Sequence, residues 1–324
     1  MFSVLTLTGP RGLGSTTLSR HETFPARQLD HGVSKQRNRP DWVAAQVPKN
    51  RGHLTLELGE RIGSGRSADV YAVKVVTAVL RDDGVPCTES PLSSELCVKV
   101  ARPNRCRSLA REAWVYEQLA ERALQGVITP NYYGFFTTTL APEQLPFPLW
   151  SNEDSGVDAR PRGKENDDPT RDDSLCDDVT WERDECTGYP PGGRELSPWV
   201  DWRPDPDSPC VSALVMARGG AKYSVNEDEW DQSVRQDVVQ ILDDLSAGFI
   251  IHRDLRPANI VRAVTDTRKC DRHDCVHEWN LIDFAWSVVD EPIGHKKTTE
   301  DFVRKLQQRN YRSSYFYTAR HPRG

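Results

Sequence analysis

One short segment in the last third of the chain carries polar side chains at a spacing that suits chemistry on a hydroxyl group. Residues Ile251–Ile260 read IHRDLRPANI. The carboxylate of Asp254 can accept the proton of an attacking hydroxyl or orient that hydroxyl. Asn259 follows five residues later, so its amide oxygen can reach back from the same loop to a metal ion. Residues of these types at this spacing suit a reaction centre, with an ordinary polar loop as the alternative.

This segment resembles the catalytic loop of protein kinases, in which His-Arg-Asp-Leu precedes an Asn five residues after the Asp. The resemblance implies that Asp254 acts as base or orienting group and that Asn259 binds Mg²⁺ on the ATP phosphates. Arg256 stands where Ser/Thr kinases usually carry Lys, just before Pro257. A cation there can neutralise charge on the transferred phosphoryl group, which favours Ser/Thr over Tyr as acceptor.

Downstream, Leu281–Ala285 reads LIDFA and resembles the Asp-Phe-Gly element of the same family. By that resemblance Asp283 holds Mg²⁺ between the β- and γ-phosphates. Ala285 stands where Gly is usual, and an Ala restricts positive φ angles, so it limits flips of this segment. The metal ligand itself is retained.

Upstream, Leu58–Tyr71 resembles the Gly-rich loop that covers ATP, with Ala68 in place of its third glycine. Taken alone, the pattern fits a tight hairpin turn equally well, but its order in the chain favours the nucleotide loop. The resemblance implies nucleotide contacts from Ile62, Gly63, Ser64, Gly65 and Val70, the last of them over the adenine ring.

Two lysines compete for the phosphate-positioning role. Lys74 lies in YAVK, which mimics the family's Val-Ala-Ile-Lys, but it comes only 11 residues after Gly63, on the strand that leaves the loop. Lys99 lies in LCVK, 36 residues after Gly63, where a turn-rich stretch accounts for the extra length. We therefore assign the role to Lys99, with a helical carboxylate as its ion-pair partner. Glu112 fits that partner better than Glu117, which is the alternative.

The run Ala213–Gly220 resembles the strand that leads into the kinase hinge. Met216 is then the gatekeeper, and backbone groups of Ala217 and Gly219 would bond the adenine edge. An ordinary core strand would show the same apolar run, and only backbone geometry distinguishes the two.

Two other constellations are less specific. Gly9–Thr16 has the glycine spacing of a phosphate-binding P-loop, but Ser15 replaces the lysine that should follow the last glycine. Residues 270–277 place Cys270, His273, Cys275 and His277 within eight positions. Ligands packed so tightly rarely close one tetrahedral site, so we interpret this stretch as a plain loop between strands, with zinc as the alternative.

Hydrophobic periodicity predicts strands at 54–58, 70–73, 96–100, 127–136 and 211–217, and helices at 107–124, 230–245 and 299–309. Residues 1–52 hold eight basic and three acidic residues without a sustained period, which predicts a flexible basic tail. Residues 151–210 hold seven basic and 17 acidic residues, which predicts a solvated, partly disordered acidic insertion. Because the whole chain has a net charge of −6, its acidity belongs mainly to this insertion.

The expected fold class is α+β, a protein kinase-like two-lobe fold with a reduced C-lobe. Residues 53–220 would form the N-lobe and hinge, including the insertion at 151–210, and residues 221–324 a shortened C-lobe. Only 39 residues follow Ala285, without an Ala-Pro-Glu motif, which fits either a gene fragment or one of the short, divergent kinase-like proteins common in fungi. A pseudokinase or scaffold that binds ATP or partners without turnover, and a small-molecule kinase, remain alternatives to a protein Ser/Thr kinase that uses ATP and Mg²⁺.

Composition limits the classes of binding partner and the cellular compartment that fit this chain. The chain of 324 residues lacks an overall basic field, which argues against a general nucleic-acid binder, and it lacks an apolar run of membrane-spanning length. Its eight scattered cysteines, without a secretory signal, predict reduced thiols in an intracellular protein of the cytoplasm or nucleus. A mitochondrial presequence is a weaker alternative, because Glu22 and Asp30 interrupt the basic N-terminus. A protein substrate is expected, and the sequence does not indicate an oligomeric state.

Overall fold

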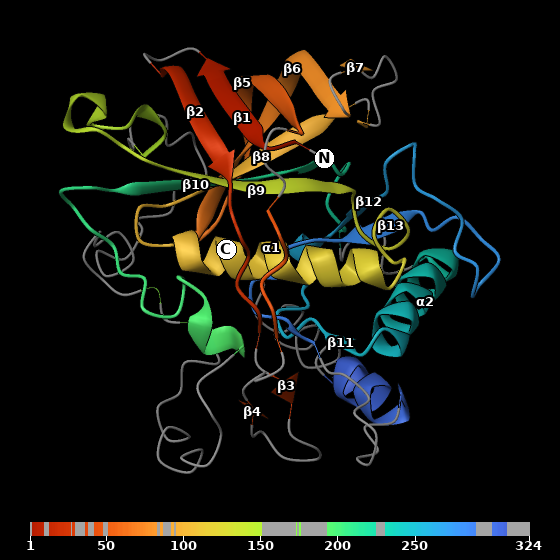
Figure 1. Ribbon diagram of the computed structural model, residues 1–324. Helices are drawn as coiled ribbons and strands as arrows, with labels where there is room; N and C mark the ends of the chain where they lie inside the picture. The colour runs from red at the N-terminus through yellow and green to blue at the C-terminus, as the bar shows by residue number, and fades with distance from the viewer. Residues whose placement is uncertain are drawn as a thin grey trace, which may run out of the picture.

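The computed structural model describes residues 2–9, 13–26, 28–29, 36–37, 42–47, 51–82, 85–86, 92–93, 95–150, 173, 175, 193–224, 231–289 and 300–309. It is a mixed α+β structure with a strand-rich, barrel-like N-terminal region and few helices (Figure 1). Most of the predicted acidic insertion at 151–210 lies outside the described residues. Among those described, no helix is both long enough and apolar enough to cross a membrane.

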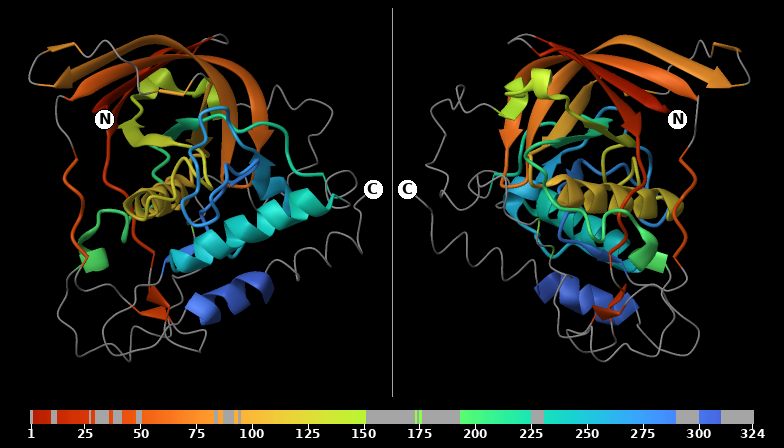
Figure 2. Two further views of the ribbon diagram at one scale, coloured as in Figure 1. Left: turned by 90° about the vertical axis from the view of Figure 1, so that its right-hand side faces the viewer. Right: turned by 60° about the vertical axis from the view of Figure 1, so that its left-hand side comes forward.

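One sheet curls round and closes on itself (Figure 2). Its spatial order is β5 (Gly52–Ser64), β1 (Val4–Gly9), β2 (Gly14–Arg20), β9 (Tyr132–Thr139), β10 (Cys210–Ala217), β8 (Leu96–Ala101), β6 (Ala68–Asp82) and β7 (Val85–Pro86). The barrel closes because β6 also pairs with β5. β1 and β5 run parallel, and the other pairs in this sheet are antiparallel. Alternate side chains fill the interior, among them the fully buried Leu5, Leu54, Val98 and Phe136.

The prediction of a flexible tail over 1–52 is wrong for the N-terminal hairpin. Phe2, Leu5, Leu7 and Leu18 are fully buried, and β1 contributes a strand to the barrel between β5 and β2. The alternation of apolar and polar residues in these short strands produces a buried face only because β5, some 50 residues later, lies beside β1 in the register Val4↔His53. The P-loop-like segment Gly9–Thr16 spans the connection of this hairpin, where Gly9 pairs with Gly14. Gly9 and Gly14 therefore belong to a hairpin.

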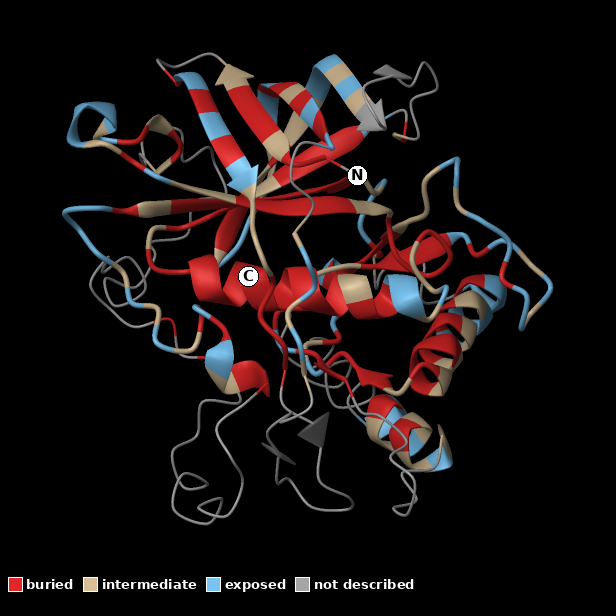
Figure 3. Cartoon of the chain, in the orientation of Figure 1, coloured by how far each residue is buried: buried red, intermediate tan, exposed pale blue. Residues whose placement is uncertain are grey.

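Helix α1 (Cys106–Glu121) confirms the helix predicted at 107–124 and crosses beneath the barrel (Figures 1 and 3). It is buried around most of its circumference, as expected of a helix enclosed between two layers. Part of the region predicted as a solvated insertion packs on its first turn, because Asp173 is only 3% exposed. The Asp173 carboxylate accepts hydrogen bonds from the Ser108 amide and hydroxyl, both at 2.6 Å, and pairs with Arg105 at 3.2 Å.

The elements below α1 are short, apart from α2 (Gln232–Ala247). Asp231 caps α2 by accepting a hydrogen bond from the Ser233 amide at 2.8 Å. The remaining elements are β3 (Gln28–Leu29), β4 (Gln36–Arg37), η1 (Pro142–Gln144), η2 (Pro148–Trp150), η4 (Gly193–Leu196), β11 (Ile250–Ile251), η5 (Pro257–Asn259), β12 (Ile260–Arg262), β13 (Trp279–Leu281) and β14 (Val288–Val289). Residues 300–309 are helical, in agreement with the predicted helix at 299–309, whereas the strand predicted at 127–136 begins only at Tyr132.

These pairings place the polar residues of interest. β12 pairs with β13, and β11 pairs with β14, so the segments on either side of Asp254 and Asp283 are fastened to each other. A second apolar core lies between the sheet, α1 and α2 and includes Trp279 and Phe284, both almost fully buried. The site residues therefore lie at the junction of two packed cores.

Candidate active site

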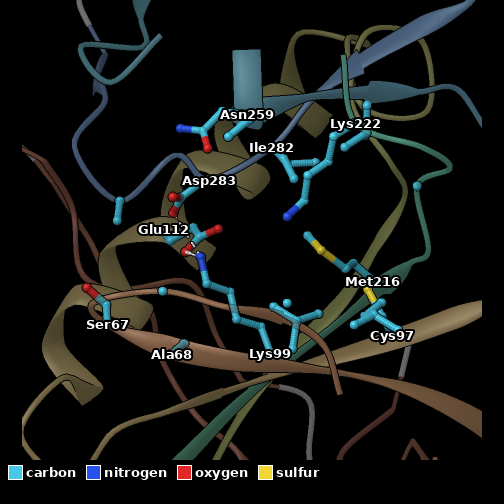
Figure 4. A pocket seen from close by; sticks show the side chains of 18 of the residues that line it. Ser67, Ala68, Cys97, Lys99, Glu112, Met216, Lys222, Asn259, Ile282 and Asp283 are labelled. Carbon is cyan, nitrogen blue, oxygen red and sulfur yellow. Dashed lines mark hydrogen bonds and ion pairs between the residues drawn. The ribbon is translucent and has the colours of Figure 1, made fainter. Parts of the chain in front are cut away.

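A cavity of about 700 Å³ lies between the barrel and the elements below it (Figure 4). Its walls include every residue that the sequence predicted for the site. These are Ile62, Gly63, Ser64, Gly65, Val70, Lys99, Glu112, Met216, Ala217, Gly219, Asp254, Arg256, Asn259 and Asp283. The alternatives lie elsewhere: Lys74 is exposed on β6, opposite Glu57, and the Glu117 carboxylate accepts a hydrogen bond from Thr23.

Lys99 on β8 joins the barrel to the elements below it. Its Nζ lies 2.6 Å from Oε2 of Glu112 on α1 and 2.9 Å from Oδ1 of Asp283. The Glu112 side chain is only 2% exposed, and burial raises its pKa to about 7 despite the attraction of Lys99. Burial also disfavours the ammonium, but the carboxylates of Asp283 and Glu112 outweigh it and raise the pKa of Lys99. Lys99 therefore stays cationic and is held in one place.

Asp283 reaches the cavity from a constrained backbone. Its φ is +67°, a left-handed conformation that Asp tolerates better than most residues. Phe284 next to it is fully buried, packed edge-on against Tyr116 at 5.3 Å and against His252 at 4.7 Å. His252 Nε2 donates to the Ile282 carbonyl at 3.0 Å. These contacts on both sides of Asp283 fix where its carboxylate points.

The positive charge of Lys99 keeps the Asp283 carboxylate ionised. Burial opposes its ionisation, but the ammonium of Lys99 outweighs burial and lowers the pKa of Asp283. Its side chain remains 32% exposed, on the side of the cavity. Asp283 therefore presents an ionised carboxylate to any ligand there.

The loop that contains Asp254 is held by its own Asn. Nδ2 of Asn259 donates to the Asp254 carbonyl at 2.8 Å and to Asp254 Oδ2 at 3.2 Å. Because both bonds use the amide nitrogen, the Asn259 oxygen remains an acceptor. Nη2 of Arg256 lies 3.2 Å from Asp254 Oδ2 and 3.8 Å from Asp283 Oδ2. Arg256 thus spans the two carboxylates at the mouth of the cavity.

The turn between β5 and β6 forms another wall. The Gly65 amide donates to the Ala68 carbonyl at 2.9 Å, and the Gly65 carbonyl accepts two bonds from the Arg102 guanidinium, at 3.0 and 3.2 Å. The Arg66 guanidinium lies 5.2 Å from the ring centre of Trp286. The turn is therefore tied both to the barrel and to the segment that follows Asp283.

The end of β10 presents backbone groups of Ala217 and Gly219 to the cavity. The Ala217 amide already donates to the Asn131 carbonyl at 2.8 Å, so at Ala217 the carbonyl is the backbone group that can serve a ligand. Within the described part of the chain, the Gly219 amide donates no backbone hydrogen bond. A Cβ on Gly219 would come within 2.5 Å of Cγ2 of Val261, so only glycine fits between the cavity and β12.

Several lining residues were not predicted from the sequence, among them Cys97, Tyr116 and Lys222. Burial raises the pKa of the Cys97 thiol to about 12, so it is an apolar wall rather than a nucleophile. The Lys222 side chain extends toward the cavity (Figure 4). No motif marks Lys222, and its place depends on the bridge between residue 222 and Val261 on β12.

No protein-family model matches the chain, and no curated protein matches it. Among solved structures, it is similar to the crystal structure of the BubR1 kinase domain, with 13% sequence identity and a TM-score of 0.35. The match covers 75% of this chain and 50% of that one, so the chain spans about half the length of the solved domain.

Proposed function

We propose that this chain is a protein kinase-like phosphotransferase that uses ATP and Mg²⁺, with protein Ser/Thr hydroxyls as the favoured acceptors. One observation carries the proposal: Lys99 Nζ lies between Glu112 and Asp283 in the cavity that also holds Asp254 and Asn259. A lysine paired in this way can bind phosphate oxygens without losing its position. The carboxylate and amide across the cavity supply acceptors for a metal ion and for a proton.

The cavity offers matching groups for the nucleotide. Val70 and Met216 provide apolar surface for a base, while the Gly219 amide and the Ala217 carbonyl provide a donor and an acceptor for its edge. The turn at Gly63–Gly65 exposes backbone next to Lys99, which is where the phosphates would lie. A Cβ on Gly63 or Gly65 would meet only ordinary contacts from the chain, so these glycines leave space toward the ligand.

The residues present also fit Mg²⁺. Asp283 is ionised and partly exposed, and the amide oxygen of Asn259 is left free by the bonds that its nitrogen makes to Asp254. Both are oxygen ligands of the type that Mg²⁺ prefers, with phosphate oxygens and water completing its shell. When bound, the ion would neutralise charge on the β- and γ-phosphates.

The transfer step assigns a task to Asp254. The acceptor hydroxyl forms a bond from its oxygen to the γ-phosphorus, the bond from that phosphorus to the β,γ-bridging oxygen breaks, and ADP leaves. Asp254 orients the hydroxyl and accepts its proton. Arg256, 3.2 Å from Asp254, places a cation beside the transferred group. Its position supports Ser/Thr as acceptor.

The experiment measures phosphate transfer from labelled Mg–ATP to the chain itself and to a generic basic protein, beside Asp254→Asn. Nucleotide binding is measured on both proteins. We expect transfer by the wild type and at least about a 100-fold loss in Asp254→Asn with binding intact. Binding without any transfer would favour the pseudokinase alternative, and transfer to metabolites but never to proteins would favour a small-molecule kinase. Either result would refute the proposed protein kinase activity.

A further inference from the structure

A second cluster of chemically active side chains lies outside the cavity, where the loop between β12 and β13 meets α2. It consists of Asp244 on α2 with Cys270, His273 and His277 from the loop. Their ligand atoms all lie within 4.8 Å of one another. Asp244, Cys270 and His277 are 2%, 4% and 1% exposed, so the cluster is built into the interior.

The distances suit a tetrahedral metal. Oδ2 of Asp244 lies 3.1 Å from Cys270 Sγ, 3.2 Å from His273 Nδ1 and 3.1 Å from His277 Nε2. Cys270 Sγ lies 3.6 Å from His273 Nδ1. Zinc bonds of about 2.0–2.3 Å in tetrahedral geometry place ligand atoms about 3.3–3.6 Å apart. These four separations therefore lie within a few tenths of an ångström of a tetrahedral shell, and the other two are bounded by 4.8 Å.

The surroundings of His277 match those of a metal ligand. Its Nδ1 lies 2.6 Å from Asp237 Oδ1, which leaves Nε2 directed at the cluster. Asp237 Oδ2 in turn accepts hydrogen bonds from the amides of Glu278 at 3.0 Å and Trp279 at 3.2 Å. Metal-binding histidines usually donate their second N–H to a carboxylate, which fixes the ring. Asp237 performs that task here.

Charge and ligand type point to zinc. One thiolate, one carboxylate and two neutral imidazoles carry a formal charge of −2. The charge of Zn²⁺ would cancel it, which matters because burial of a net charge is costly. A set of one sulfur, two nitrogens and one oxygen suits zinc better than Mg²⁺ or Ca²⁺. Cys275 lies 4.0 Å from Nδ1 of His277, the nitrogen that faces Asp237, so it is on the wrong side of the ring to join the set.

We propose that Asp244, Cys270, His273 and His277 bind one Zn²⁺ in a closed structural site. The loop at 270–277, interpreted from sequence as plain, lacks a suitable fourth ligand of its own, and α2 supplies it. The site would fasten this loop to α2 just before β13, which continues into the segment of Asp283. That segment is tied to the Asp254 loop where the Ile282 amide donates to the Asn259 carbonyl at 3.0 Å. The proposal does not depend on the proposed phosphotransfer.

The test is the metal content of the purified full chain under reducing conditions, by mass spectrometry. We expect one zinc per chain in the wild type and in the matched control Cys275→Ser. In Cys270→Ser and in Asp244→Asn the bound zinc should fall at least about tenfold. Retention of zinc in Cys270→Ser together with its loss in Cys275→Ser would show that the ligand set is wrong.

A second measurement covers the case in which the ligand variants fail to fold. Wild-type chain stripped with a chelator is titrated with Co²⁺, whose visible absorption distinguishes tetrahedral from octahedral coordination. We expect an intense tetrahedral spectrum with a thiolate-to-cobalt charge-transfer band that saturates at one equivalent and disappears when zinc is added. Wild type that carries no stoichiometric zinc and leaves cobalt octahedral would overturn the proposal.

Discussion

Replacing Lys99 by Met removes the cation between two carboxylates while keeping the length of the side chain. The Glu112 side chain, which is only 2% exposed, then loses the ammonium that lies 2.6 Å from its carboxylate in the wild type. Removing one partner of a buried ion pair costs about 3–5 kcal/mol, because the other charge stays buried. The Lys99 side chain is 12% exposed and Asp283 keeps contact with solvent, so we expect a loss of about 3 kcal/mol in the free energy of unfolding.

This loss should depend on pH, and its sign follows from Glu112. The pKa of Glu112 is about 7 in the folded wild type, against an ordinary value of 4.5. Between these two pH values Glu112 is ionised in the unfolded chain but protonated in the folded one, so the free energy of unfolding of the wild type falls as the pH rises. Above about pH 7 both states are ionised and this decline stops. Without Lys99 the folded pKa rises further, and the decline continues above about pH 7. The gap between wild type and Lys99→Met should therefore widen by about 1.4 kcal/mol per pH unit above about pH 7.

The assay is urea unfolding of both proteins at about pH 6 and about pH 8.5, with midpoints and slopes compared. The double variant Lys99→Met/Glu112→Gln is the control, because a neutral amide cannot ionise and should abolish the extra pH dependence. A gap of the same size at both pH values would refute the reasoning, since it would show that Lys99 does not stabilise the ionised form of Glu112.

Three further changes test separate parts of the structure. Phe284→Ala should cost about 3–5 kcal/mol of stability in denaturant unfolding and reduce transfer, because it removes the buried ring beside Asp283; an unchanged midpoint would contradict that packing. Gly219→Ala should weaken ATP binding and lower the free energy of unfolding, with Gly65→Ala as the control that keeps the wild-type unfolding midpoint, because only the first new Cβ meets Val261 at 2.5 Å; equal losses of stability would argue against this close approach. Leu7→Ala should cost about 2–5 kcal/mol in thermal or urea unfolding, whereas a truly flexible N-terminus would show no loss.

Local patterns predicted the elements that are decided locally. The helical period at 107–124 corresponds to α1, and the glycine-rich turn after β5 and the strand at 211–217 lie where their patterns placed them. The choice between Lys99 and Lys74 rested on counting strands, and β8 indeed lies between β6 and β10, with Lys99 opposite Leu214. Because β5, β6 and β8 pair in chain order, counting residues along the chain was enough to place each lysine on its strand.

Features that depend on distant pairing could not be predicted. The hairpin β1–β2 contributes buried leucines only because β5 and β9 lie on either side of it, and neither partner is adjacent in sequence. Asp173 is one acidic residue among many in its region, yet it is buried against Ser108 and Arg105. Asp244 joins the Cys/His loop from 26 residues before Cys270, across a helix boundary that spacing alone does not reveal.

The central claim is that the cavity binds Mg–ATP, and calorimetry on the folded wild-type chain tests it most directly. We predict saturable ATP binding that Mg²⁺ strengthens, retained ATP binding without that strengthening in Asp283→Asn, and loss of binding in Lys99→Met at a pH where that variant stays folded. A folded wild-type chain that binds no ATP, with or without Mg²⁺, would contradict the account.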